Sequence, residues 1–122
     1  MKLDTDLIRD ILLWCEGKLP DKERSYQASE IEIKDYTSDQ ILYHVELLVD
    51  GEYLKVIDAS AGSYKDYFIE RLTYDGAQFL EIIKSNTVWK KFKEKAKELG
   101  LPTVQVILPI LVDLLKKQLG LP

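Results

Sequence analysis

Apolar residues recur at helical spacing near the start of the chain and predict a first helix. One face of that helix carries Leu7, Ile8, Ile11, Leu12 and Cys15. Asp4 or Thr5 can cap the helix, and Gly17 with the following Pro20 predicts its end. Trp14 lies off this apolar face, which leaves it free to pack against a later element.

The next stretch, ASEIEIKDY, alternates polar and apolar residues and predicts a short strand with Ile31, Ile33 and Tyr36 on its buried side. Residues 38–50 return to helical spacing, with Ser38 as the cap and Gly51 as the stop. The core-facing stripe of this helix spans about 120° of its circumference. Its members are Ile41, Leu42, Val45, Leu48 and Val49.

Two strand-like runs, residues 52–59 and 65–72, flank the loop sequence SAGSY and predict a β-hairpin. A helix that leads into a hairpin is the arrangement of recognition helix and wing in a winged helix-turn-helix. The pattern therefore predicts an α+β fold in which residues 1–72 form a winged helix-turn-helix-like part: helix, short strand, helix and β-hairpin wing.

About three C-terminal helices are predicted to follow in residues 73–122 and to complete a single domain of residues 1–122. Thr73 caps the first of them, and a break at the sequence SNT precedes the second. The second helix places apolar residues on one face: Val88, Trp89, Phe92, Ala96 and Leu99. The last helix contains Pro109, which either kinks it or marks the start of its regular part.

Composition narrows the possible functions. With 1 cysteine and 1 histidine, the chain has no internal disulfide, and a cysteine-rich or multi-histidine metal site is excluded. The longest apolar run, residues 106–112, is too short to span a bilayer, and the N-terminal stretch has no apolar signal core. We expect a cytoplasmic protein without a membrane partner, metal or cofactor.

Charge is distributed unevenly along the chain. Residues 1–83 carry 9 basic and 18 acidic side chains, a balance of −9, whereas residues 84–122 carry 8 basic and 3 acidic ones, a balance of +5, and together these give the net charge of −4. Any phosphate-binding surface is therefore expected in the C-terminal third.

Several stretches resemble a family of short bacterial, prophage-associated proteins of unknown function. They are MKLDTDLIRDILL, YTSDQILYHVELLVDGEYL and RLTYDGAQFLEIIKSNTVWKKFKEKAKE, within which LTYDG and NTVWKK are the most distinctive. The resemblance covers nearly the whole chain and implies a winged-helix-like fold, with no known catalytic residues and no established activity. A standard winged helix has a further short helix between Gly17 and Ser38, where this sequence offers a loop and IEIKDY.

A DNA-binding interpretation assigns base or phosphate contacts to Gln40, Tyr43 and His44 of the helix 38–50. That helix carries three acidic residues and no Lys or Arg, so its charge repels phosphate. Other contacts would come from the wing loop and a lysine face: Ser63, Tyr64, Lys65, Lys90, Lys93 and Lys97. Glu94 and Glu98 interleave with these lysines, as on an ordinary solvated helix surface.

A protein-binding interpretation starts from Tyr43 and Leu47, which lie one turn apart and off the core stripe. Either the wing or the C-terminal helices cover them, or they form a binding surface. The last helix is apolar around about 200°, which predicts burial on two sides. It is the centre of its own core or, in the interpretation we favour, a homodimer interface that includes Ile107, Leu111 and Leu114.

Catalysis is not expected, because no nucleophile motif, phosphate-binding glycine loop or metal-ligand spacing is present in the sequence. A lone histidine such as His44 is more often a packed residue than a base. Two hypotheses follow: a prophage-associated transcriptional regulator that binds double-stranded DNA as a dimer, or an acidic winged-helix scaffold that binds a host or phage protein.

Overall fold

The computed structural model describes residues 2–19, 24–99, 104–118 and 120, apart from the side chains of residues 99, 104–108, 115 and 118. Within these residues the fold is α+β, with five α-helices and one three-stranded antiparallel sheet. The element bounds are α1 Thr5–Lys18, β1 Tyr26–Gln27, a 3-10 helix Ala28–Glu30, α2 Ser38–Asp50, β2 Leu54–Asp58, β3 Tyr67–Leu72, α3 Tyr74–Ile83, α4 Asn86–Leu99 and α5 Val104–Gln118.

The helix α1 lies at the centre of the core. All five residues of its predicted apolar face are fully buried. Asp4 is the N-cap, since its side chain accepts a hydrogen bond from the backbone N–H of Leu7. Trp14 packs edge-to-face on Tyr26 with ring centroids 5.4 Å apart, which confirms its expected role against a later element. The helix continues one residue beyond Gly17, to Lys18.

The strand predicted within ASEIEIKDY is wrong. The strand β1 ends at Gln27, before this stretch begins, and residues 28–30 form one turn of 3-10 helix closed by a capping box between Gln27 and Glu30. Asp35 then adopts a positive φ of 73°, a turn conformation that ends any extended run. The alternation instead reflects Ile31, which is buried, and Ile33 and Tyr36, which pack partly against the core.

The helix α2 begins at Ser38 as predicted, but its cap is Thr37. The Thr37 side chain accepts from the backbone N–H of Gln40, while the Gln40 side chain accepts from the backbone N–H of Thr37. This reciprocal pair satisfies two free amides, which a cap at Ser38 could not do from inside the helix. Gly51 is the C-cap, as predicted.

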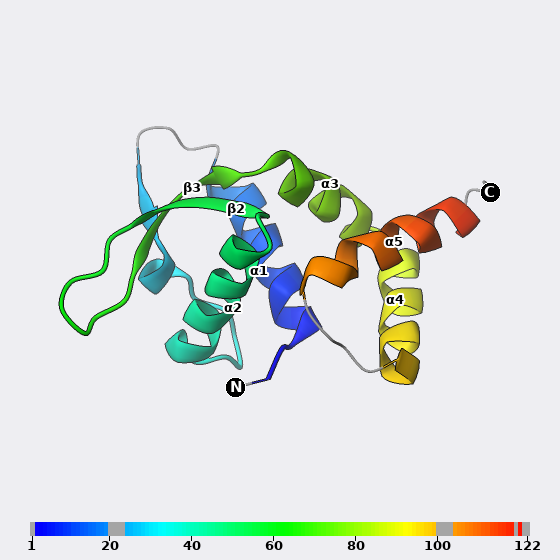
Figure 1. Ribbon diagram of the computed structural model, residues 1–122, viewed down its shortest axis with the longest axis horizontal. Coiled ribbons are helices and arrows are strands. Elements are labelled where there is room, and N and C mark those ends of the chain that lie inside the picture. Colours follow the sequence, from blue (N-terminus) through cyan, green and yellow to red (C-terminus); the bar gives the residue numbers. More distant parts are fainter. Residues whose placement is uncertain (1, 20–23, 100–103, 119, 121–122) are drawn as a thin grey trace.

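The hairpin of β2 and β3 is confirmed, and β3 is the middle strand in the order β1-β3-β2. A bulge interrupts the register between Lys55 and Val56. Figure 1 shows the hairpin loop at one end of the long axis and α4 and α5 at the other, with α1 and α2 between them.

The three helices predicted in the C-terminal part are present as α3, α4 and α5. Thr73 caps α3, and Gly76 lies so close to the hairpin that a Cβ there would be 2.0 Å from the carbonyl oxygen of Tyr53. Ser85 accepts from the backbone N–H of Val88 at the start of α4. Pro109 lies inside α5, which begins at Val104, so Pro109 does not start that helix.

Candidate interaction surfaces

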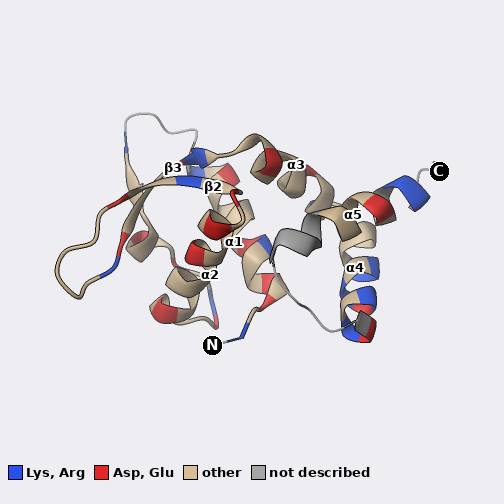
Figure 2. Ribbon diagram, viewed as in Figure 1, with Lys and Arg blue, Asp and Glu red and all other residues tan. Residues whose placement is uncertain are grey.

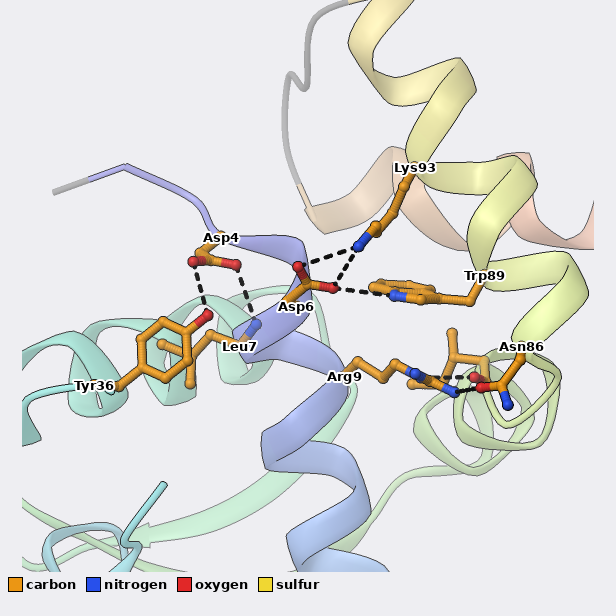
Figure 3. A network of polar contacts seen from close by, with 9 residues as sticks. Asp4, Asp6, Leu7, Arg9, Tyr36, Asn86, Trp89 and Lys93 are labelled. Carbon is orange, nitrogen blue, oxygen red and sulfur yellow. Dashed lines mark hydrogen bonds and ion pairs between the residues drawn. The ribbon is translucent and has the colours of Figure 1, made fainter. Parts of the chain in front are cut away.

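The N-terminus of α1 anchors two other helices (Figure 3). Asp4 accepts a hydrogen bond from the Tyr36 hydroxyl at 3.0 Å, in the loop before α2. Asp6 accepts one from Trp89 Nε1 at 3.1 Å and forms an ion pair with Lys93 Nζ at 3.3 Å, both on α4. One turn of α1 therefore orients the segment before α2 and the helix α4 relative to each other.

Arg9 strengthens the same junction. Its Nε donates to the carbonyl oxygen of Ile83 at 2.9 Å, and its guanidinium donates to Asn86 Oδ1 at 2.8 Å (Figure 3). The guanidinium also lies 5.5 Å from the centre of the Trp89 ring, within the range of a cation–π contact. These contacts fix the turn between α3 and α4 on α1.

His44, predicted from the sequence as a DNA contact, is buried and serves a structural role in the fold. It is 2 % exposed, and both ring nitrogens are engaged. Nε2 accepts from the backbone N–H of Asp4 at 2.8 Å, so Nδ1 carries the proton that it shares with the carbonyl oxygen of Gln40 at 2.7 Å. Burial lowers the pKa of His44, although the Gln40 carbonyl and the charge of Asp4 act in the opposite direction.

The other two candidate readers on α2 are also partly committed to the fold. The Gln40 side chain belongs to the capping box of α2. Tyr43 is half-buried and lies edge-to-face on His44 at 5.4 Å. Leu47, its predicted partner on a binding surface, is partly buried against the core. The apolar stripe in the sequence did not predict the partial burial of Tyr43 and Leu47, because a single stripe assumes that only one side of the helix is covered.

What α2 presents outward is acidic. Glu46 is half-buried and Asp50 is exposed, and both are close enough to β3 to act on the hydroxyl of Tyr67. Burial first, and then the charges of Glu46, Asp58 and Asp50, raise the pKa of Tyr67, against the effect of Lys65. The face between α2 and the hairpin therefore carries three carboxylates and Lys65 near one tyrosine.

The hairpin loop is exposed at Ser63, Tyr64 and Lys65, so these predicted contacts are accessible. Tyr64 is 59 % exposed, and Gly62 supplies the positive φ of 60° that the turn needs. The loop remains a candidate contact surface.

Asp66 is a residue that the sequence analysis missed. It is 1 % exposed, and its carboxylate accepts from the backbone N–H and hydroxyl of Ser29 and from the backbone N–H of Tyr67. These bonds tie the end of the loop to the 3-10 helix. A lone acid in a polar loop has no pattern that distinguishes it from a solvated one, so only the structure could identify it.

The outer face of the hairpin is apolar and was also missed. Ile57 and Phe68 lie opposite each other in the register and are 56 % and 39 % exposed. The signal was in the sequence, because both lie on the face opposite to Val56 and Ile69 in a period of two. Because the two side chains are adjacent, together they offer an apolar surface for contact.

The lysine face of α4 is divided. Lys90 and Lys97 are exposed, whereas Lys93 pairs with Asp6. Figure 2 shows the lysines of α4 and the hairpin loop at opposite ends of the molecule, with the acidic residues of α1 and α2 between them. The two candidate phosphate-binding surfaces therefore do not form one continuous positive surface.

The residues of α5 that were predicted to form a homodimer interface differ in their burial. Leu111 is fully buried and Leu114 is partly buried against the core, while the side chain of Ile107 lies outside the described residues. Since α5 packs on α3 and α4, its broad apolar circumference is at least partly used within its own chain.

Comparison with known proteins assigns the chain to a family. A family model described as "Hypothetical protein (DUF2513)" matches residues 2–102. The chain belongs to this family. It is also 30 % identical over 101 residues to an uncharacterized protein of Haemophilus influenzae (strain Rd), and the match covers 83 % of each chain. No solved structure matches.

The described residues lack two features that would point to other functions. No cluster of three or more His, Cys, Asp or Glu side chains in them could hold a metal ion. None of the helices in this part of the chain is long and apolar enough to cross a membrane.

Proposed function

We propose that this protein is a winged-helix-like scaffold that binds another protein, of host or phage origin, through the face between α2 and the hairpin. The element order supports the scaffold: α1, a short strand, one 3-10 turn in place of the middle helix, α2 and a hairpin. In a DNA-binding winged helix this face meets the phosphate backbone. Here α2 packs on β2 and brings Glu46 and Asp50 to the side of the hairpin that carries Asp58, opposite Tyr67, so that three carboxylates outnumber the nearby Lys65, and this is the observation that carries the proposal.

The charge of this face disfavours DNA. Phosphate neutralisation supplies most of the non-specific affinity of a DNA-binding protein, and three carboxylates would oppose it. The same carboxylates attract a protein partner that presents Lys or Arg. Of the predicted readers, His44 is buried and Gln40 serves as part of a cap.

A pull-down from a lysate of the encoding organism tests the proposal by charge reversal. The double variant Glu46→Lys/Asp50→Lys should lose a protein partner that the wild type retains. Glu94→Lys/Glu98→Lys on α4 is the matched control, because it makes the same change in net charge far from the proposed face. Equal recovery of every partner by the two variants would exclude this face.

DNA binding by a dimer is the second candidate, and the exposed lysines Lys90 and Lys97 favour it. It requires two copies whose α4 helices contact one duplex, since the hairpin loop of each copy lies at the other end. A gel-shift assay with a pool of random duplexes at low salt decides between the candidates. A shift that weakens steeply with salt, and is lost in Lys90→Glu/Lys97→Glu, would favour DNA.

A further inference from the structure

We propose that the free edge of β2 binds an extended segment of the partner protein as a fourth strand of the sheet, with basic residues on one side of that segment and apolar residues on the other. This inference rests on the proposed function and specifies how the partner is bound. It is carried by the hydrogen-bond pattern of the hairpin and by the side chains on its two faces.

The pattern of the ladder identifies which backbone groups are free. Ala59 donates its N–H to Asp66 and Thr73 donates to Tyr53, in register with the two ends of the β2–β3 pairing. Because bonded and non-bonded pairs alternate in an antiparallel ladder, Leu54, Val56 and Asp58 turn their N–H and C=O groups away from β3. In the described part of the chain, no backbone bond outside the ladder uses those groups.

The opposite edge of the sheet is different. It is formed by β1, which is only 2 residues long and continues at once into the 3-10 helix. A short strand is a poor template for pairing, whereas β2 has 5 residues. An added strand would therefore pair with β2. The free groups of Val56, which is half-buried, and of Asp58, which is exposed, give the main-chain affinity that such binding uses, whereas Leu54 is buried.

The faces of the hairpin specify the side chains of the added strand. On the outer face Ile57 and Phe68 are exposed, and the nearby Lys55 is already paired with Glu70 at 3.7 Å. This face is apolar at Ile57 and Phe68 and fits apolar residues there, while Arg71 lies exposed opposite Lys55 at its other end. On the inner face Glu46, Asp50 and Asp58 fit Lys or Arg.

The start of β2 continues the acidic face. A hollow of about 410 Å³ lies beside Leu54 and Lys55, and it is also lined by the acidic residues Glu52 and Asp75. Because the side chains of an added strand alternate between the two faces, the complementary segment alternates basic and apolar residues.

Short synthetic peptides test this directly on the full chain. We expect a fluorescent peptide of alternating lysine and valine to bind in an anisotropy titration, and one of alternating glutamate and valine not to bind. A second lysine–valine peptide, in which every backbone nitrogen is methylated, has the same charge as the first but no main-chain N–H donors. It should bind at least about tenfold more weakly, the effect of losing one or more charge-independent hydrogen bonds.

Amide hydrogen exchange locates the site. Bound lysine–valine peptide should slow the exchange of the amides of Val56 and Asp58, with little change at Ile57, whose amide already faces β3. The variant Val56→Pro removes one outward N–H without removing a ladder bond, and should weaken binding about tenfold or more. A thermal melt confirms that the variant is folded, and if it is not, the pattern of amide protection in the wild type decides.

The outcomes separate this inference from the proposed function. Equal binding of the N-methylated and unmodified lysine–valine peptides would overturn strand addition while leaving an acidic protein-binding face intact. No binding of the lysine–valine peptide would also overturn strand addition. The charge-reversal pull-down would then still test whether the acidic face binds a protein. Amides protected in proportion to protein concentration without peptide would mean that a second copy occupies the edge, which also overturns the proposal.

Discussion

The helices α2 and α4 are both amphipathic and are both held by the first turn of α1, but by different means. α2 is held through His44, which is buried and donates and accepts as a neutral ring. α4 is held through Trp89 and Lys93, which both reach the partly exposed carboxylate of Asp6. Their outward faces also differ, since that of α2 is acidic and that of α4 is rich in lysine.

The difference teaches where the fold is rigid. A buried hydrogen bond is costly to break because the group left behind cannot reach water, whereas an exposed ion pair is replaced by solvent. The orientation of α2 against α1 should therefore be fixed more firmly than that of α4. The face we propose for protein binding is built on the firmer of the two.

The largest expected effect is that of His44→Ala. It leaves the backbone N–H of Asp4 and the Gln40 carbonyl without their partner and opens a cavity beside Leu7, at a cost of about 3 kcal/mol in the free energy of unfolding. Urea denaturation measures it. Glu46→Ala on the same helix is the control, with a change within about 0.5 kcal/mol. A similar loss in both variants would contradict the anchoring role.

A smaller effect is expected from acid. The folded state lowers the pKa of His44 below its usual value of 6.5, so the unfolded chain takes up a proton first as the pH falls. The stability that the neutral ring contributes is complete above that pH and is progressively lost below it. Melting temperatures of wild type and His44→Ala should therefore converge as the pH is lowered. A constant gap would mean that the ring does not titrate differently on folding.

On α4, Trp89→Phe tests the anchor to Asp6 while retaining the stack on Phe92. Loss of the indole N–H removes one hydrogen bond to a charged acceptor, and the free energy of unfolding should fall by about 1.5 kcal/mol. Chemical denaturation with tyrosine or far-ultraviolet detection measures it. A loss as large as that of His44→Ala would remove the contrast between the two helices.

The smallest effect is expected from Lys93→Met. The lysine side chain is 42 % exposed and that of Asp6 is 51 % exposed, so the pair contributes less than about 1 kcal/mol. The difference from wild type should shrink further at high salt, because screening weakens exposed pairs. A loss that is unaffected by salt would show that Lys93 acts by packing its alkyl chain instead.

Much of the fold could be predicted from residues at regular spacing. The buried stripes of α1 and α4 and the hairpin agree with the structure, because burial on one face leaves a period that is readable in the sequence. The strand assigned to residues around Ile31 failed, because alternation over so few residues also arises from a turn that packs Ile31 into the core.

The candidate site was less predictable. His44 looked like an outward reader by its position on the helix, and only the approach of Asp4, 40 residues away in the chain, shows that it is buried. The exposed pair Ile57 and Phe68 could have been found from the period of the strands. The edge of β2 is free because the strand order is β1-β3-β2. Strand order cannot be read from the pattern of neighbouring residues in the sequence.

The sequence by itself determined the segments that form the α-helices and the hairpin, the apolar side of α1 and α4, and the separation of acidic and basic residues along the chain. Those properties are local, since they depend on neighbours within a few residues. Only the tertiary structure decided that the first turn of α1 anchors both α2 and α4, that the acidic residues lie near Tyr67 beside the hairpin, and that the lysines of α4 lie at the far end. These are contacts between distant segments, and they depend on how the apolar faces pack together.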